Sequence, residues 1–271
     1  MSMIQGAFRR YAATLLGGQS GDRRQDMPLP THPVVHLPID VQERYVDTLR
    51  ADRREDYPRR IHEFRNALRE CDVPTIHVGY GDIGGGRKRE RNDIKHVARC
   101  SPWRMPCPEF REELSDFAKD RKLLVLPYKD EDVIVKCFDD AFQKKSVADC
   151  GLADLLKRYG VKTVIMTGGN TTACVLSSAV GALAAGFNLL IVYDRLADKW
   201  SPEQESSPFW HKEKLWDISD EGFAAWSGIS RPRASVRLVT AAECLALVAR
   251  QNGQPEPPRP IAQSPLQPVL R

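Results

Sequence analysis

The sequence lacks the features that mark membrane, secreted and nucleic-acid-binding proteins. Its 271 residues contain no apolar run of transmembrane length, and the N-terminus has no compact apolar segment followed by a cleavage pattern. Forty Lys and Arg residues nearly balance 36 Asp and Glu residues, so the net charge is only +4. That charge is too small to indicate nucleic-acid binding by itself. We therefore expect no membrane or nucleic-acid partner, and a cytoplasmic protein.

Disulfide and metal patterns are also missing. The seven cysteines are odd in number and form no CxxC pair, which argues against a disulfide framework and favours a reducing compartment. No two of the six histidines have the spacing of metal ligands. We predict no metal and no other cofactor. His36 and His77 lie inside apolar runs and are predicted to be core residues.

Proline-rich segments flank a central core. The segment MPLPTHP closes an N-terminal extension, and a second Pro-rich stretch ends the chain. We predict an extension over residues 1–30, one domain over 31–251 and a Pro-rich tail over 252–271. No internal repeat is visible.

The core alternates apolar runs with amphipathic segments. Strands are expected at 33–40, 74–80, 162–168, 188–194 and 234–240, with further apolar runs at 122–127 and 132–138. Helices are expected at 56–71, 147–160, 173–185, 211–226 and 241–251. Because the strands are apolar almost throughout, they predict a parallel sheet covered on both faces.

Three reactive side chains lie where strands end, which is where such sheets place their sites. Asp40 ends the first strand, Lys136 lies near the end of the run 132–138, and Cys174 opens a helix after a Gly/Thr loop. A helix N-terminus and a nearby cation both favour a thiolate. Asp40 could accept the thiol proton and return it to a leaving amine, while Lys136 stabilises negative charge.

Ordinary structural roles compete with this interpretation. A single cysteine is usually a small buried hydrophobe, and an aspartate at a strand end is usually a turn residue. Lys136 is harder to explain, because a charge buried among apolar residues needs a carboxylate partner or a route to solvent. Cys137 is a rival nucleophile, but neighbours in a strand point to opposite faces.

Three ordered blocks carry a family resemblance. They are VVHLPIDVQERYV at 34–46, DEDVIVKCFDDAF at 130–142, and the segment 161–198 with its Gly-x-x-Thr-x-x-Cys-Val motif from Gly168 to Val175. Together they resemble the isochorismatase-like cysteine hydrolases, which include nicotinamidases and N-carbamoylsarcosine amidases. The resemblance covers about 34–248. It implies a three-layer α/β/α sandwich with a mostly parallel, Rossmann-like, six-stranded sheet, and a homodimer or homotetramer.

The resemblance also assigns roles to residues. It implies a catalytic triad of Asp40, Lys136 and Cys174, and a cis peptide bond between Gly169 and Asn170. The main-chain N–H groups of Asn170 and Cys174 would form the oxyanion hole. Substrate-binding roles are implied for Gln42 and Phe142.

The sequence departs from the family in two places. Nicotinamidases carry an Asp-x-His-type metal cluster near the second strand, and its absence here disfavours nicotinamidase activity. The segment 81–110 is unusually rich in Gly and Arg. It is either an ordinary surface loop or a lid whose basic groups meet an anionic substrate such as a carboxylate. Trp103 within it could line the pocket or simply pack.

The predicted function is hydrolysis of a C–N bond in a small molecule. A cysteine-dependent enzyme would cleave an amide, ureido or carbamoyl group through a thioester. Two alternatives stay open. One is isochorismatase-type hydrolysis of a vinyl ether, which needs an acid more than a nucleophile. The other is a non-catalytic binding protein that kept the scaffold.

Overall fold

A computed structural model describes the core of the chain. It covers residues 33–80, 95–96, 123–125, 127–128, 131–136, 139–143, 151–207, 209–222 and 234–251. The predicted extension 1–30, the tail 252–271, Trp103 and nearly all of the Arg-rich segment lie outside the described residues.

One seven-stranded sheet forms the centre of the molecule, in the order β3-β4-β2-β1-β5-β6-β7. The strands are β1 (Val34–Ile39), β2 (Ile76–Tyr80), β3 (Lys95–His96), β4 (Asp132–Lys136), β5 (Thr163–Gly169), β6 (Asn188–Ala197) and β7 (Val236–Val239). The α/β class and the mostly parallel sheet are confirmed. The sheet has seven strands rather than six, because the two-residue β3 pairs antiparallel with β4.

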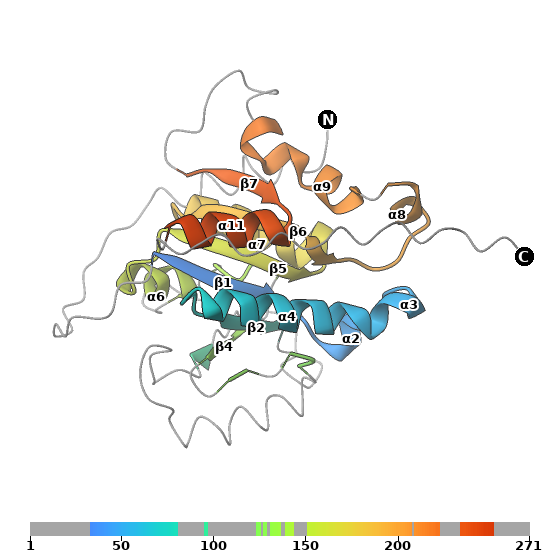
Figure 1. Cartoon of the computed structure of the whole chain (residues 1–271), viewed down its shortest axis with the longest axis horizontal. Helices are drawn as coiled ribbons and strands as arrows, with labels where there is room; N and C mark the ends of the chain where they lie inside the picture. Colours follow the sequence, from blue (N-terminus) through green and yellow to red (C-terminus); the bar gives the residue numbers. More distant parts are fainter. Residues whose placement is uncertain are drawn as a thin grey trace, which may run out of the picture.

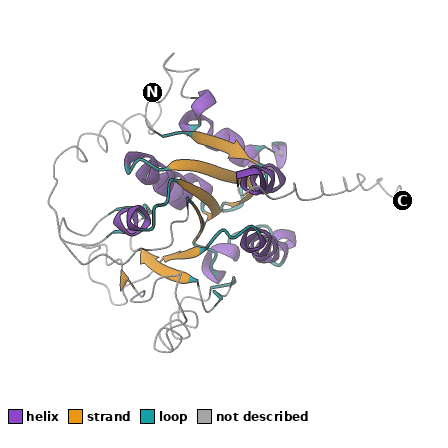
Figure 2. Cartoon of the chain, turned by 60° about the vertical axis from the view of Figure 1, so that its left-hand side comes forward, coloured by secondary structure: helices purple, strands orange, loops and turns teal. Residues whose placement is uncertain are grey.

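Helices cover both faces of this sheet, which gives three layers (Figures 1 and 2). Helices α4 and α11 lie on one face, and α6 and α7 lie on the other. The helices are α2 (Glu43–Val46), α3 (Ala51–Arg54), α4 (Asp56–Glu70), α6 (Leu152–Arg158), the π-helix η1 (Thr171–Val175), α7 (Leu176–Ala184), α8 (Glu203–Ser206), α9 (Trp210–Lys214), the 3-10 helix η2 (Trp216–Ile218) and α11 (Ala241–Gln251).

Successive side chains of each central strand pack into the cores on opposite faces of the sheet, because a strand is pleated. In β1, Val35 and Leu37 pack beneath α6 and α7, whereas Val34 packs towards α4 and α11. Two cysteines, Cys71 and Cys244, are buried in the second core. Burial on both faces explains why the strands read as continuous apolar runs. His36 and His77 are buried, as predicted.

The predicted helix over 211–226 is wrong as a single element. Helix α9 ends at Lys214, and the chain turns through η2. Leu215 and Ile218 are buried at this break. A new helical turn then begins after Ser219, whose hydroxyl accepts a hydrogen bond from the N–H of Gly222. The apolar periodicity therefore marked buried positions but not the break between them.

Candidate active site

Asp40 leaves the end of β1 in a left-handed conformation, with φ +49°. Its N–H donates to the carbonyl of Val78 in β2, and its own carbonyl accepts from the N–H of Gln42. These bonds hold the turn on both sides. They hold Asp40, which is 1% exposed, at the carboxyl edge of the sheet.

Gly168 allows β5 to approach β1 closely at this point. It pairs with Ile39 and has φ +111°. A Cβ atom at this position would lie 2.0 Å from the carbonyl oxygen of Ile39. Only glycine fits, because it has no Cβ and tolerates positive φ. The segment that leads to Cys174 is thereby brought against the strand that ends in Asp40.

Lys136, at the end of β4, has the carboxylate partner that its burial required. Its Nζ lies 2.8 Å from Oδ2 of Asp40, donates to the carbonyl oxygen of Asp139 over 3.2 Å, and lies 5.1 Å from the centre of the Tyr80 ring. Burial alone would lower the pKa of Lys136, but Asp40 and the Cys174 sulfur raise it above its ordinary value. The group is therefore an ammonium ion at neutral pH.

Cys174 lies in η1, directly after β5, and is 3% exposed. It interacts with both Asp40 and Lys136. Burial, assisted by the Asp40 charge, raises the pKa of the thiol far above its ordinary value, although Lys136 opposes the shift. The cation and the helix start favour a thiolate, but burial favours the protonated thiol, which leaves a proton for Asp40 to accept.

The Asp40 carboxyl group is suited to take that proton. Burial raises its pKa, while the positive charge of Lys136 and the nearby Cys174 thiol oppose the rise. Among the described residues, its Oδ1 makes no hydrogen bond of ordinary geometry. A thiol, a weakly acidic carboxyl group and a fixed ammonium ion thus meet in one buried place.

Asp139 is a second carboxylate at the nucleophile, and sequence reasoning missed it. The Cys174 Sγ donates to its Oδ1 over 3.6 Å, and its carbonyl oxygen accepts from Ser178 of α7 over 3.2 Å. Its neighbour Asp140 lies against Gly181 of α7, where a Cβ atom would meet Oδ1 at 2.3 Å. This docking onto α7 aims Asp139 at the thiol. The only signal in the sequence was the pair of aspartates after Lys136.

The turn that carries Cys174 is tied to β6. The Gly169–Asn170 peptide bond is cis, at the position that the resemblance implied. The carbonyl oxygen of Asn170 accepts from Ala173 and Val175. The carboxylate of Asp198 accepts from the N–H and the hydroxyl of Thr172, over 2.8 and 2.7 Å.

The two described candidates for substrate binding make contacts within the protein. The amide of Gln42 exchanges two hydrogen bonds with the main chain of Tyr80, and Phe142 packs on Phe187 in the core. Their roles towards a substrate stay predictions. Sequence reasoning missed Tyr45 and Tyr80, whose rings pack edge to face beside the site, 6.5 Å apart. Arg44 lies over both rings.

Within the described residues, no group of three or more His, Cys, Asp or Glu side chains is arranged to hold a metal ion. None of the helices in the described part of the chain has the length and apolar character needed to cross a bilayer.

Comparisons with known proteins agree with this architecture. The chain is 34% identical to a maleamate amidohydrolase from Pseudomonas putida over 155 residues, which is 55% of this chain and 64% of the relative, so the match spans a little under two thirds of that enzyme. A protein of Burkholderia xenovorans, provisionally named an isochorismatase, shares the fold with a TM-score of 0.50 and 20% identity over 84% of this chain and 91% of its own. A cysteine hydrolase of Pseudomonas syringae gives a TM-score of 0.48 and 15% identity over 83% and 99% of the two chains. A family model described as "Isochorismatase domain" matches residues 34–207, well over half of the chain. The chain belongs to the isochorismatase family.

Proposed function

We propose that the protein is a cysteine-dependent hydrolase that cleaves a C–N bond of a small molecule. The observation that carries the proposal is the meeting of Asp40, Lys136 and the Cys174 thiol, with the ammonium 2.8 Å from the carboxylate. The likeness to an enzyme named maleamate amidohydrolase supports an amide as the substrate. Ureido and carbamoyl compounds belong to the same chemical class.

The protonation states suggest how the reaction begins. Because burial keeps Cys174 as a thiol, its proton moves to Asp40 as the sulfur attacks the carbonyl carbon. The main-chain N–H groups of Asn170 and Cys174 stabilise the oxyanion that forms. Lys136 keeps Asp40 ionised before the attack and offsets negative charge during it.

Two further steps complete the turnover. Asp40 returns the proton to the departing nitrogen, and the C–N bond breaks to release ammonia or an amine and leave a thioester on Cys174. Water then attacks the thioester carbonyl, with Asp40 accepting a proton, and the free acid and the thiol are released.

Replacement of the nucleophile is the first test. The Cys174→Ala variant should lose at least about a thousandfold in kcat/KM, because no other group can form the thioester. A screen of primary amides, maleamate among them, and of ureido and carbamoyl compounds, read out by ammonia release, identifies the substrate for this measurement.

A second buried thiol provides the control. Cys71 lies at the end of α4, away from the site, so Cys71→Ala should retain activity. If Cys174→Ala hydrolyses the substrate as fast as the unchanged protein does, covalent catalysis is excluded.

Vinyl-ether hydrolysis is a second candidate, favoured by the raised pKa of the Asp40 carboxyl group, which suits a general acid. That reaction forms no acyl-enzyme. Mass spectrometry of the protein stopped during turnover separates the two, since only amide chemistry adds an acyl group to Cys174. The cytoplasmic location and the homodimer or homotetramer stay predictions, and light scattering on the purified protein measures the latter.

A further inference from the structure

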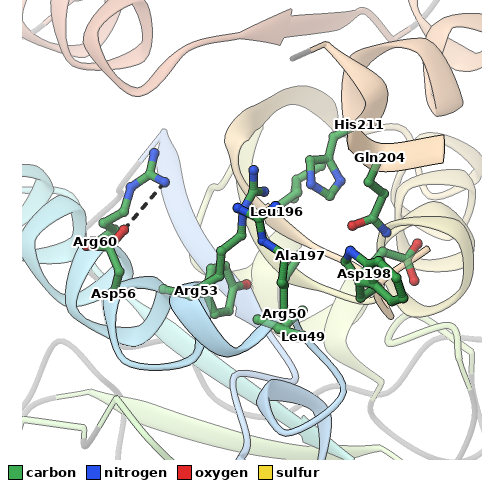
Figure 3. Close-up of a pocket in the computed structure, with 12 residues that line it drawn as sticks. Leu49, Arg50, Arg53, Asp56, Arg60, Leu196, Ala197, Asp198, Gln204 and His211 are labelled. Carbon is green, nitrogen blue, oxygen red and sulfur yellow. Dashed lines mark ion pairs between the residues drawn. The ribbon is translucent and has the colours of Figure 1, made fainter. Parts of the chain in front are cut away.

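A cavity of about 390 Å³ lies at the carboxyl end of β6. Figure 3 shows that it lies between the start of α4, with the turn before it, and the segment that follows β6. Its walls combine arginine side chains with a small apolar floor. The lining residues used below are Arg50, Arg53, Tyr57, Arg60, Asp198 and His211.

This cavity adjoins the candidate active site but is lined by residues other than the triad. None of Asp40, Lys136 and Cys174 lines it. Its wall residues Tyr57 and Ala197 belong to an apolar cluster with Val41 and Ile61, whereas Cys174 belongs to the core beneath α6 and α7. The cavity also touches the nucleophile turn, because His211 and Asp198 in its wall bond to Thr171 and Thr172.

The cavity has an excess of positive charge. Arg50 is paired with Asp52, and Arg60 approaches Asp56 at 3.8 Å and donates to the carbonyl oxygen of Asp194. In the part of the chain that the structure describes, no carboxylate lies within ion-pair distance of Arg53.

Asp198 offsets only part of this charge. Its oxygens accept three hydrogen bonds, from the N–H and hydroxyl of Thr172 and from the N–H of Lys199. Its negative charge is thus directed at the main chain of η1. Burial, with a smaller contribution from the nearby Arg53 guanidinium, lowers the pKa of His211 to about 4.

One polar group in the wall lacks a hydrogen-bond partner among the described residues, and a second can accept a hydrogen bond. Tyr57 is 7% exposed, and within the described residues its buried hydroxyl has no hydrogen-bond partner. An unsatisfied buried hydroxyl is costly and is rare without a function. His211 accounts for the second group. The Thr171 hydroxyl donates to the Ala197 carbonyl oxygen and so accepts from Nδ1–H of His211. Nε2 of the neutral ring is then an acceptor.

We propose that this cavity is a second binding site, which takes a phosphate group through Arg53 and the Tyr57 hydroxyl. A guanidinium fork matches the oxygens of an anion, and the Tyr57 hydroxyl gains the acceptor that it lacks. Hydrogen phosphate also carries a hydroxyl that can donate to Nε2 of His211. A carboxylate can pair with Arg53 and accept from the Tyr57 hydroxyl, but it has no hydrogen to donate to Nε2 of His211.

Calorimetric titration of the full-length protein tests the site with inorganic phosphate, glycerol 3-phosphate and succinate at constant ionic strength. Saturable phosphate binding is the expected result, and comparison with glycerol 3-phosphate distinguishes a free ion from a phosphomonoester. Arg53→Gln should weaken phosphate binding by about tenfold or more. The control Lys157→Gln removes a charge from α6, on the opposite face, and should leave binding unchanged.

Tyr57→Phe provides a test that does not depend on charge. It should raise the melting temperature of the ligand-free protein, because it removes an unsatisfied hydroxyl, and should weaken phosphate binding. Cys174→Ala should bind phosphate normally. The proposal is overturned if phosphate does not bind at millimolar concentration, if succinate binds more tightly than phosphate, or if Tyr57→Phe and Arg53→Gln bind as the unchanged protein does. None of these results depends on whether the protein hydrolyses amides.

Discussion

At the scale of single residues, burial governs the chemistry of the candidate active site. The same desolvation that raises the pKa of the Cys174 thiol also raises the pKa of Asp40. The proton therefore rests on sulfur but has a nearby carboxylate able to accept it, which favours attack concerted with proton transfer. Lys136 stays charged because Asp40 is anionic and the Cys174 sulfur becomes anionic when it loses its proton; both raise the pKa of Lys136. A substrate that excludes the remaining water strengthens all three interactions.

The Asp139 carboxylate should slow the alkylation of Cys174 by a negatively charged reagent more than by a neutral one. Its carboxylate is 3.6 Å from the Cys174 sulfur, and a unit charge at about 4 Å is worth about 1 kcal/mol in water. Asp139→Asn should therefore raise the rate of Cys174 alkylation by iodoacetate, relative to neutral iodoacetamide, by about fivefold. Mass spectrometry of the Cys174 peptide measures both rates. Asp217→Asn, an exposed change elsewhere, should not alter the ratio. An unchanged ratio in Asp139→Asn would remove Asp139 from the site.

At the scale of elements, the contact between β1 and β5 determines whether the site forms. Asp40 and Cys174 follow these neighbouring strands, and Gly168 lets the strands approach at the point where both side chains leave the sheet. The turn 139–142 adds Asp139 from α7's side through Ser178 and Gly181. The three segments are far apart in the chain, so their alignment depends on sheet register.

Gly168→Ala should destabilise the fold strongly. The new Cβ would lie 2.0 Å from the Ile39 carbonyl oxygen at φ +111°, so β1 and β5 must separate. We expect a loss of about 3 kcal/mol or more in the free energy of unfolding by urea. Gly186→Ala is the matched control, since Gly186 also has positive φ but no atom within 4 Å of the added Cβ. It should cost only about 1–2 kcal/mol. Equal losses would mean that the close approach is unimportant.

At the scale of the whole molecule, three histidines with lowered pKa values, His36, His77 and His211, link folding to pH. Burial holds the pKa of His36 well below 6.5, lowers that of His77 and lowers that of His211 to about 4. The unfolded chain therefore binds more protons than the folded protein between about pH 4 and 6.5.

Stability should accordingly fall as the pH decreases through this window. Each histidine contributes up to about 1.4 kcal/mol per pH unit. Asp40, whose pKa burial raises, acts in the opposite direction. Urea unfolding at a series of pH values measures the slope. His36→Gln should reduce it, whereas His62→Gln, at an exposed position, should not. A flat stability profile from pH 7 to about pH 5 would contradict the expectation.

Strand-end chemistry could be predicted from the sequence because parallel strands bring their carboxyl ends to one edge. That rule was enough to pair Asp40 with Lys136 and to bring Cys174 beside them. It could not find Asp139, whose direction depends on packing against α7. It also could not find the phosphate cavity, because residues 49–60 and 196–211 meet only through the tertiary fold. The extent to which burial raises the pKa of Cys174 could not be predicted either, because the degree of burial is not visible in a motif.

The rate at which a reagent labels each buried thiol reports how often the structure around that thiol opens. Cys174 belongs to the core on the side of α6 and α7, whereas Cys71, at the end of α4, and Cys244, in α11, belong to the core on the opposite face, so a bulky thiol reagent reaches the two cores through separate openings. Labelling rates at the three sites, followed peptide by peptide without denaturant, would reveal whether the two helical layers detach together or one at a time. A substrate bound at Cys174 would slow labelling there, and its effect at the two distant thiols would measure how far that stabilisation extends through the sheet.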